Sequence, residues 1–563
     1  MALDKTYKLS LKQWTRNGEP FIWANASAVT ISTLAVIGLL LLLAVRGFGH
    51  FWPSDILQVD YAVPGKKPVT IIGEVVGSEE VPREQLHAAG VNIDTDAELV
   101  GRSLIKQGNR DVTGVDFRWV INNYLTGTQY PRDVMLLERR EWGNFYGYPV
   151  ALRESGNKVA TDDLWKALQQ RIERAEGIHK QIKEIEKGRI GAINYSLERL
   201  RLRSRELDLQ PSISPTEKRA ALADIAAERA GLKQEYSVLQ QQLAELYREF
   251  NRDTLLARTA NGTEVSIPVA KIVHAYRPNA MGVTAKIGTY LVKFYDFLSE
   301  DPREANTEGG IFPAIFGTVM MVMLMSAIVT PFGVIAAVYL REYARQGLLT
   351  RIVRIAVNNL AGVPSIVYGV FGLGFFIYFV GAEIDRVMFQ AALPSPTFGT
   401  PGLLWASLTL ALLTLPVVIV ATEEGLSRIP RSLREGSLAL GATKAETLWR
   451  VVLPMASPAM MTGLILAVAR AAGEVAPLML VGVVKLAPSL PLDGNYPYLH
   501  LDRKFMHLGF HIYDVGFQGP NVEAARPLVY ATALLLVIII ALLNFSAVAM
   551  RNHLRERYKA LEM

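Results

Sequence analysis

Six long apolar runs, separated by polar stretches, set the predicted architecture of this chain. A helix needs about 20 mainly apolar residues to cross a bilayer. The pattern therefore predicts a polytopic α-helical membrane protein with six transmembrane helices. We expect these spans at approximately Ala28–Val45, Ile311–Val338, Leu360–Val380, Leu403–Ala421, Ala459–Val484 and Leu528–Met550.

Basic residues gather at alternate ends of these runs. Loops with an excess of Lys and Arg stay on the cytoplasmic side of a membrane, and the connection from Gly381 to Pro401 has only Arg386. Both termini and the loop between the fourth and fifth spans are therefore predicted to be cytoplasmic. The four basic groups are Lys5, Lys8, Lys12 and Arg16; Arg341, Arg345, Arg351 and Arg354; Arg428, Arg431, Arg434, Lys444 and Arg450; and Arg551, Arg555, Arg557 and Lys559.

The first apolar run has some features of a signal peptide. However, its apolar stretch is too long, its polar leader is extended, and Val45-Arg46-Gly47 is a poor cleavage site. We interpret it as an uncleaved anchor. Residues 48–305, which follow it, are then expected outside the cytoplasm.

This outer segment mixes strand and helix patterns. Runs such as Val69–Val76 and Val115–Asn122 are bounded by Gly, Pro and Asp, as is typical of strands. Leu255–Thr259 and Glu264–Val269 flank Asn261-Gly262, a favoured hairpin turn. Because strand patterns lie on both sides of a helical region, we expect one small α+β domain into which the helices are inserted.

Residues 160–250 form that helical region, with two apolar stripes at helical spacing. The first has a break near Gly188, and a turn around Pro211–Ser214 follows it. Ser214-Pro215-Thr216-Glu217 then supplies an N-cap, a proline at the first helical position and an acid in the first turn. Two such stripes predict an antiparallel coiled-coil hairpin. Arg229 occupies a seam position and should loosen the packing there.

The composition limits the chemistry available to the chain. Half of its 563 residues are hydrophobic and none is cysteine, which excludes disulfides and cysteine-based metal or redox chemistry. The net charge of +6 reflects membrane topology rather than a nucleic-acid partner. No nucleotide-binding loop is present, because Gly65-Lys66 lacks both the upstream glycine spacing and the following Ser or Thr. ATP hydrolysis would have to come from another chain, and no cofactor is expected.

The loop between the fourth and fifth spans predicts two short helices joined by a tight turn. Gly441 stands where a left-handed helix end favours glycine. Thr443 and Glu446 have the spacing of a capping box for the next helix, which Pro454 should end. We call this element, Glu435–Pro454, the knob, and we interpret it as a rigid surface for a soluble partner.

The knob also carries a family resemblance, over Glu435, Gly436, Ser437, Gly441, Val451, Leu453 and Pro454. In this spacing they resemble the EAA loop of ABC-importer permeases, with Gly-Ser in place of Ala-Ala and valine in place of isoleucine. In that family the loop docks into a groove on a separate ATPase subunit, so the resemblance implies that these seven residues couple to an ATPase. A DNA-binding helix–turn–helix is disfavoured because the knob is tethered between two spans.

Two charged residues stand out within the predicted fifth span. Arg470 and Glu474 are four residues apart, which places both on one face of a helix. Ionisable groups at membrane depth line a pathway or pair with each other, and a guanidinium suits a tetrahedral oxyanion. We favour a substrate pathway over a salt bridge that only orients the helix. The two roles are compatible, because Glu474 could hold Arg470 and release it when an anion arrives.

Three histidines raise the question of a metal site. His507 and His511 lie one helical turn apart, with His500 nearby. An acidic third ligand at a recognised spacing is missing, so the sequence does not favour zinc. We expect no metal there.

Three segments carry a more specific resemblance: Arg470-Ala-Ala-Gly-Glu474-Val-Ala-Pro-Leu478, Leu360–Gly369 and Thr330–Leu340. Together they resemble the PstA-type permeases of phosphate ABC importers, over about residues 310–550. The resemblance implies a MetI-like permease core in the bacterial inner membrane. It also implies four partners: a PstC-like permease subunit, a PstB-like ATPase dimer, a PstS-like phosphate-binding protein and the lipid bilayer. The long outer segment departs from the family, whose members have a short loop there.

The combined expectation is a non-enzymatic permease subunit of an ATP-driven importer of inorganic phosphate. A permease for another oxyanion (phosphonate, sulfate or molybdate) stays open, as does a signalling scaffold that transports nothing. The expected layout is a cytoplasmic N-terminus and first anchor at 1–47, a periplasmic domain at 48–305, a permease domain at 306–550 with its cytoplasmic loop at 422–456, and a cytoplasmic tail at 551–563.

Overall fold

The computed structural model describes residues 11–558 apart from 66, 89–92, 94–96, 211, 520 and 521. Lys5, Lys8, Lys66, Pro211 and Lys559, discussed above, lie outside the described residues. Within the described part, six helical stretches are long and apolar enough to cross a membrane, which confirms the predicted number. They are Glu19–Gly49, Phe312–Tyr343, Ser365–Met388, Leu403–Arg428, Lys444–Gly473 and Ala525–Glu556.

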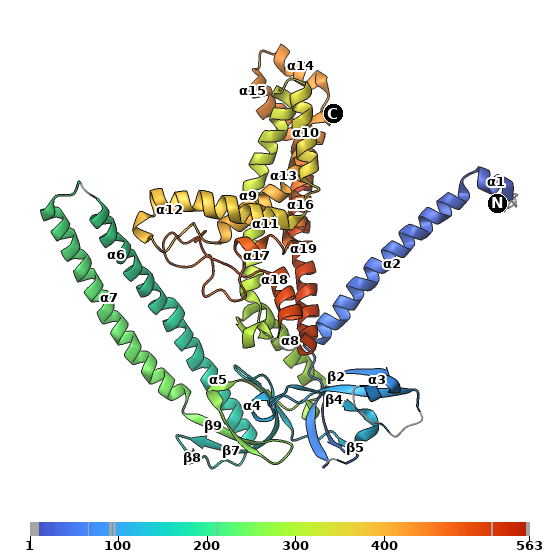
Figure 1. Cartoon of the computed structure of the whole chain (residues 1–563), viewed down its shortest axis with the longest axis vertical. Helices are drawn as coiled ribbons and strands as arrows, with labels where there is room; N and C mark the ends of the chain where they lie inside the picture. Colours follow the sequence, from blue (N-terminus) through green and yellow to red (C-terminus); the bar gives the residue numbers. More distant parts are fainter. Residues whose placement is uncertain are drawn as a thin grey trace.

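The helical bundle is built around the helices that begin at Phe312, Leu403 and Leu453. Met321, Met325, Leu410, Val418 and Ala467 are among the residues buried between them. The C-terminal end of α2 packs against α19. The rest of α2 stands away from the bundle, with its side chains exposed (Figure 1). The helices are α1 (Leu11–Arg16), α2 (Glu19–Gly49), α9 (Phe312–Val338) with its π-helical continuation η6 (Tyr339–Tyr343), α13 (Leu403–Arg428), α16 (Leu453–Gly473) and α19 (Val522–Tyr558).

The third apolar run is broken, and the predicted span Leu360–Val380 is wrong in its bounds. The helix α10 (Leu348–Leu360) ends where the run begins. Pro364, whose ring disfavours helical geometry in the residue before it, then stands at the N-cap of α11 (Ser365–Phe371). The chain continues through π-helical η7 (Gly372–Gly381) and α12 (Ala382–Met388), so that this run crosses the direction of α10 (Figure 1).

The fifth apolar run is also placed differently from the prediction of Ala459–Val484. The helical stretch starts earlier, at Lys444, and ends at Gly473. Gly473 and Pro477 both disfavour helix, and the apolar residues beyond them form a separate short helix, α17 (Leu478–Val481). Hydrophobicity alone extended the predicted span past this break.

The insert between α2 and α9, predicted as one small α+β domain, contains two large antiparallel sheets and one two-stranded sheet among the described residues. The first sheet, in the order β4-β3-β2-β1-β5, comes entirely from the residues before Val134. Its strands are β1 (Ile56–Tyr61), β2 (Val69–Pro82), β3 (Leu99–Lys106), β4 (Phe117–Ile121) and β5 (Leu125–Gln129), with short helices α3 (Arg83–Ala88) and α4 (Arg110–Thr113) between them.

The second sheet joins strands from both sides of the helical region, as predicted. Its order is β10-β9-β7-β6-β11, with β8 on β7. Ile56 and Ile72 of the first sheet pack against Leu136 and Tyr276 of the second, so the two sheets share a core. The strands are β6 (Met135–Arg139), β7 (Phe145–Glu154), β8 (Asn157–Lys158), β9 (Asp253–Arg258), β10 (Glu264–Pro268) and β11 (Ile272–Tyr276); α8 (Val283–Ser299) and the short pair β12 (Pro302–Arg303) and β13 (Glu308–Gly309) lead to α9.

Two long helical arms leave the second sheet and run beside the bundle (Figure 1). One consists of α5 (Leu164–Lys183), π-helical η2 (Glu184–Ile190) and α6 (Gly191–Leu209), and the other is α7 (Pro215–Phe250). The predicted break near Gly188 is this π-helical segment, within which the helix continues. Ser214 and Glu217 form the predicted capping box. We call the two helices together the arm pair.

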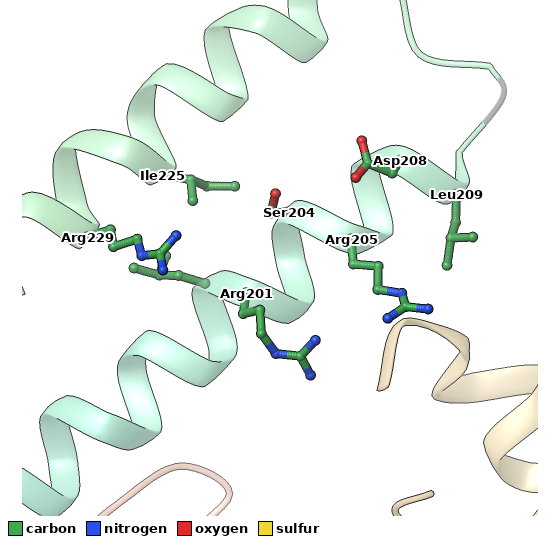
Figure 2. Close-up of a pocket in the computed structure, with 8 residues that line it drawn as sticks. Arg201, Ser204, Arg205, Asp208, Leu209, Ile225 and Arg229 are labelled. Carbon is green, nitrogen blue, oxygen red and sulfur yellow. The ribbon is translucent and has the colours of Figure 1, made fainter. Parts of the chain in front are cut away.

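A hollow separates the arms near their far end. It has a volume of about 390 Å³ and is lined by Ser204, Asp208, Ile225 and Arg229 among others. Figure 2 shows Arg229 reaching from α7 toward α6, while Arg201 and Arg205 project from α6 away from α7. Arg229 therefore lies where the helices are loosely packed, as its seam position predicts.

Candidate functional site

The knob has the local structure that its sequence predicts. The first short helix, α14 (Arg431–Ala439), is followed by Leu440 and then by Gly441 at φ +88°. Only glycine adopts this left-handed conformation without steric cost. The N–H groups of Gly441 and Ala442 donate to the carbonyl oxygens of Leu438 and Ser437, which closes the helix end.

A reciprocal capping box starts the second short helix, α15 (Lys444–Thr447). The Thr443 hydroxyl accepts from the N–H of Glu446 at 3.2 Å, and the Glu446 carboxylate accepts from the N–H of Thr443 at 2.9 Å. The hydroxyls of Ser437 and Thr447 are hydrogen-bonded at 2.9 Å and join the two short helices. The turn is therefore held by bonds between residues at most ten positions apart.

Pro454 does not end this helix, contrary to the prediction. The chain continues from α15 through π-helical η9 (Leu448–Val452) directly into α16, where Pro454 occupies one of the first two positions. Proline removes one backbone donor from this continuing helix, and the π-helical turn η9 lies directly before it. The knob is thus a direct extension of the fifth membrane-spanning helix, with Val451 in the wide turn and Leu453 at the start of α16.

Contacts to the end of the second span hold the knob in place. The Arg434 guanidinium donates to the Glu342 carboxylate at 2.9 Å and to the carbonyl oxygens of Ile429 and Leu426. Lys444 donates to the backbone carbonyl of Glu342 and lies 4.4 Å from the ring centre of Tyr343. Sequence reasoning missed this brace, because nothing near the knob points to a partner some 90 positions earlier.

Several other residues of the knob are exposed. Glu435 and Gly436 are exposed, and so are two large apolar side chains, Leu440 at 91% and Trp449 at 75%. Exposed apolar side chains next to polar ones are typical of a protein interface. The knob therefore presents a formed surface, and the exposure of Leu440 and Trp449 could not be read from the sequence.

The second candidate site lies at the other end of α16. Arg470 is in the last helical turn, and Glu474 has left the helix with extended backbone. Their side chains still approach each other, with 3.5 Å between Arg470 Nε and Glu474 Oε1. Both remain partly accessible, at 33% and 20% of the side-chain surface. The pair is therefore an ion pair at a helix break, rather than two charges on one continuous helical face.

Segments that are distant in sequence pack on the residues that follow this helix break. A Cβ added at Gly369 in α11 would lie 2.7 Å from the Cα of Pro477, so the third apolar run packs directly on the segment after Glu474. The carbonyl of Val481, at the end of α17, accepts from the N–H of Gly402 at the start of α13. Helices far apart in sequence thus meet at the residues that follow the ion pair.

A braced loop lies beyond this break. Asp493 accepts from Arg503 at 2.6 Å and pairs with His500 at 2.9 Å. Burial raises the pKa of Asp493, but hydrogen bonds from the Asn495 N–H, Arg503 and His500 outweigh it and lower the pKa to about 2. The carboxylate is therefore charged at neutral pH and holds the loop Leu490–Arg503 together. We call this segment the 490–503 loop.

The other two histidines serve the packing of α18 (Leu508–Tyr513). His507 Nδ1 accepts from the Gly509 N–H at 3.1 Å and caps the helix. Burial lowers the pKa of His507 to about 3 and that of His511 to about 4, so both are neutral at physiological pH. Among the described residues, no group of three or more ligating side chains is placed to hold a metal ion.

Comparison with known proteins places this architecture in a class. The family model described as "Binding-protein-dependent transport system inner membrane component" matches residues 329–560. Among solved structures, the chain is similar to one from the inward facing MetNI methionine ABC transporter, with 20% identity, a TM-score of 0.31, and coverage of 43% of this chain and 94% of that chain. The residues that the family model matches include the knob and the ion pair, so the membrane part is an inner-membrane component of a binding-protein-dependent transport system.

Curated relatives narrow the class further. "Phosphate transport system permease protein PstA 1" of Mycobacterium tuberculosis (strain CDC 1551 / Oshkosh) is 35% identical over 247 residues, which is 43% of this chain and 71% of the relative. "Phosphate transport system permease protein PstA" of Mycobacterium leprae (strain TN) is 34% identical over 276 residues, 48% of this chain and 81% of the relative. The chain therefore belongs to the PstA family of phosphate transport system permease proteins. Like other ABC permease subunits, it is a multi-pass inner-membrane protein without enzymatic activity of its own.

Proposed function

We propose that this protein is the permease subunit of an ATP-driven importer of inorganic phosphate. The observation that carries the proposal is the similarity to phosphate permeases at 35% identity, together with a family match over residues 329–560, which include the structured knob and the ion pair. The proposed partners are a PstC-like permease, a PstB-like ATPase dimer and a PstS-like phosphate-binding protein. The preceding contacts support a role for each end of α16.

The knob end is the proposed docking site for the ATPase. Its turn is stiffened by the capping box and by Gly441, and it is braced to the second span through Arg434 and Glu342. Because the knob continues into α16 without a break, a push on its exposed surface would be transmitted along the fifth span. We assign Glu435, Gly436, Ser437, Val451, Leu453 and Pro454 to this coupling element together with Gly441.

The ion-pair end is the proposed phosphate pathway. A guanidinium offers several N–H donors in a planar fork, which fits a tetrahedral oxyanion. Arg470 is only partly buried and its bond to Glu474 is long, at 3.5 Å. An incoming phosphate could therefore take over Arg470 from Glu474, and the arginine would return to its partner after release.

The charge pattern supports an orientation. We propose that both termini and the knob are cytoplasmic, following the Lys and Arg clusters. The sheets and the arm pair, within residues 48–305, then lie in the periplasm. Residues 306–550 form the permease domain with its cytoplasmic loop at 422–456, and the arm pair is an antiparallel coiled coil loosened at Arg229.

Uptake by the reconstituted complex tests this function. The chain, with its partner permease, ATPase and phosphate-binding protein, is placed in liposomes, and radiolabelled phosphate is followed with and without ATP. We expect ATP-dependent accumulation that unlabelled phosphate blocks and that sulfate, molybdate and phosphonate do not. Blocking by one of these competitors alone would identify a different oxyanion importer, and an ATP-independent signal would contradict an importer.

A further inference from the structure

The base of the arm pair is fixed to the second sheet. Leu168, Ile172 and Ala175 of α5 are buried in the core of that sheet. Arg174 donates to the buried carboxylate of Asp253 in β9 at 2.6 Å. Apolar burial together with a buried ion pair leaves α5 little freedom to move relative to the sheet.

The helix of the first arm is distorted just beyond this base. The π-helical segment η2 lies between α5 and α6, and it contains Gly188 and is followed by Gly191. Such segments are local distortions at which helices bend. In α7, Gly231 precedes Leu232, which packs in the same cluster as Ile193 of α6. We call η2 the hinge; its Ile185 is packed in the cluster between the two arms.

The hinge at η2 is attached to the start of the second membrane span. The ammonium groups of Lys183 and Lys187 each lie 2.8 Å from the carboxylate of Asp301. Asp301 lies between α8 and α9, and its carbonyl accepts from the Gly310 N–H just before α9. The hinge is thus anchored on one side to the sheet and on the other to the membrane bundle.

Beyond the hinge, α6 rests on the 490–503 loop through a few polar and aromatic contacts. The Tyr195 hydroxyl donates to the backbone carbonyl of Tyr496, and the Tyr195 ring meets His500 edge-on at 5.8 Å. The Arg199 guanidinium lies 5.9 Å from the ring centre of Tyr496, which is itself exposed. Contacts of this kind are individually weak at exposed positions, so they can separate without disrupting a hydrophobic core.

The 490–503 loop connects this contact to the ion-pair end of α16. The N–H groups of Leu403 and Leu404, at the start of α13, donate to the carbonyls of Arg503 and Leu501 at 2.9 Å. The Phe505 N–H donates to the carbonyl of Gly482, directly after α17. Movement of the loop must therefore act on the start of α13 and on the segment that follows Glu474.

We propose that the arm pair is a hinged latch that bends at η2 and closes α6 onto the 490–503 loop. The latch holds the loop while α6 is down, and it must open in each transport cycle so that the start of α13 and the segment after Glu474 can move. This proposal rests on the proposed function, since it concerns the regulation of the same pathway.

A reversible cross-link tests the latch, because the chain has no cysteine of its own. We would introduce Tyr195→Cys and Tyr496→Cys together, and each alone as a matched control, into the complete reconstituted complex. Oxidation should join α6 to the loop in the double variant. We expect phosphate uptake to be lost on oxidation and to return on reduction, while both single variants keep their uptake under oxidation.

Several outcomes would overturn the latch. One is full uptake by a completely cross-linked double variant. Another is failure of both a disulfide and a short bis-maleimide to join the two positions, since the contact would then not exist in the membrane. A third is loss of uptake in the reduced double variant while the wild type is active. The contact would then be needed at all times, as a permanent brace, and not as a latch that opens. By contrast, a wild-type complex that does not take up phosphate counts against the proposed function and not against the latch.

Discussion

The two ends of α16 are built in different ways, although one continuous helix joins them. At the knob end, Gly441, Thr443 and Glu446 close the turn through bonds to near neighbours in sequence. At the other end, Glu474 leaves the helix where segments far away in sequence, including Gly369, pack on its continuation. The proposed docking surface is thus closed by local bonds and braced to Glu342, whereas the proposed pathway lining depends on packing between distant segments.

The substitution Gly441→Pro should break the knob end most severely. Proline fixes φ near −65°, whereas Gly441 has φ +88°, and it removes the N–H that donates to Leu438. We expect ATP-driven uptake to be abolished while membrane insertion, measured by fractionation, stays normal. The matched control is Gly262→Pro, at φ +82° in the turn between β9 and β10, which should leave coupling unchanged. Retained uptake in the Gly441 variant would refute the docking role.

The substitution Arg470→Gln tests the other end. Hydrogen bonds to a charged group contribute about 1.5–3 kcal/mol, so their loss should lower phosphate uptake by about tenfold or more. Binding of ATPase to the complex should not change, which separates this end from the knob. Arg386→Gln serves as the control, since Arg386 is exposed and pairs with Glu383 within one helical turn. Equal uptake in both variants would exclude Arg470 from the pathway.

As the pH falls, the ion-pair end of the bundle should lose stability at a higher pH than the knob does. His507 is neutral in the folded protein, with a pKa lowered by burial from 6.5 to about 3. The unfolded chain takes up a proton below pH 6.5 and the folded chain does not, so stability should fall as the pH drops from 6.5 toward 3. His507→Asn keeps an acceptor for the Gly509 N–H and removes the titration. Its Tm should therefore fall less over this range; identical slopes for variant and wild type would argue against the buried neutral state.

The mildest predicted effect is that of Thr443→Ala. Loss of an N-cap costs about 1 kcal/mol, which should make the start of α15 open more often without abolishing the knob. Faster amide hydrogen exchange of Ala445 and Glu446 would report this, together with a modest fall in uptake. Thr462→Ala is a suitable control, because the Thr462 hydroxyl bonds back to Pro458 within α16 and caps nothing. If the two variants exchange alike, the capping box does not stiffen the turn.

The helical insert illustrates where sequence reasoning succeeded and where it failed. Ser214 and Glu217 form the expected capping box, and Arg229 lies beside the expected loose packing. These outcomes depend on residues a few positions apart or on the charge of a single side chain. The contact of Tyr195 with Tyr496 could not be foreseen, because the two residues lie 301 positions apart. The sequence predicted a break near Gly188 but not its π-helical form.

By itself, the sequence determined the number of apolar helices, the two-helix form of the knob and the candidate pair Arg470 and Glu474. Hydrophobic length, helix capping and the backbone freedom of glycine act over a few residues, so they can be read along the chain. Only the tertiary structure decided that Gly369 packs on the segment after the end of α16, that Pro454 stays within a continuing helix, and that Arg434 is held by Glu342. The reason is physical: these outcomes depend on contacts between helices that are far apart in sequence, and a local pattern contains no information about which distant residue will make them.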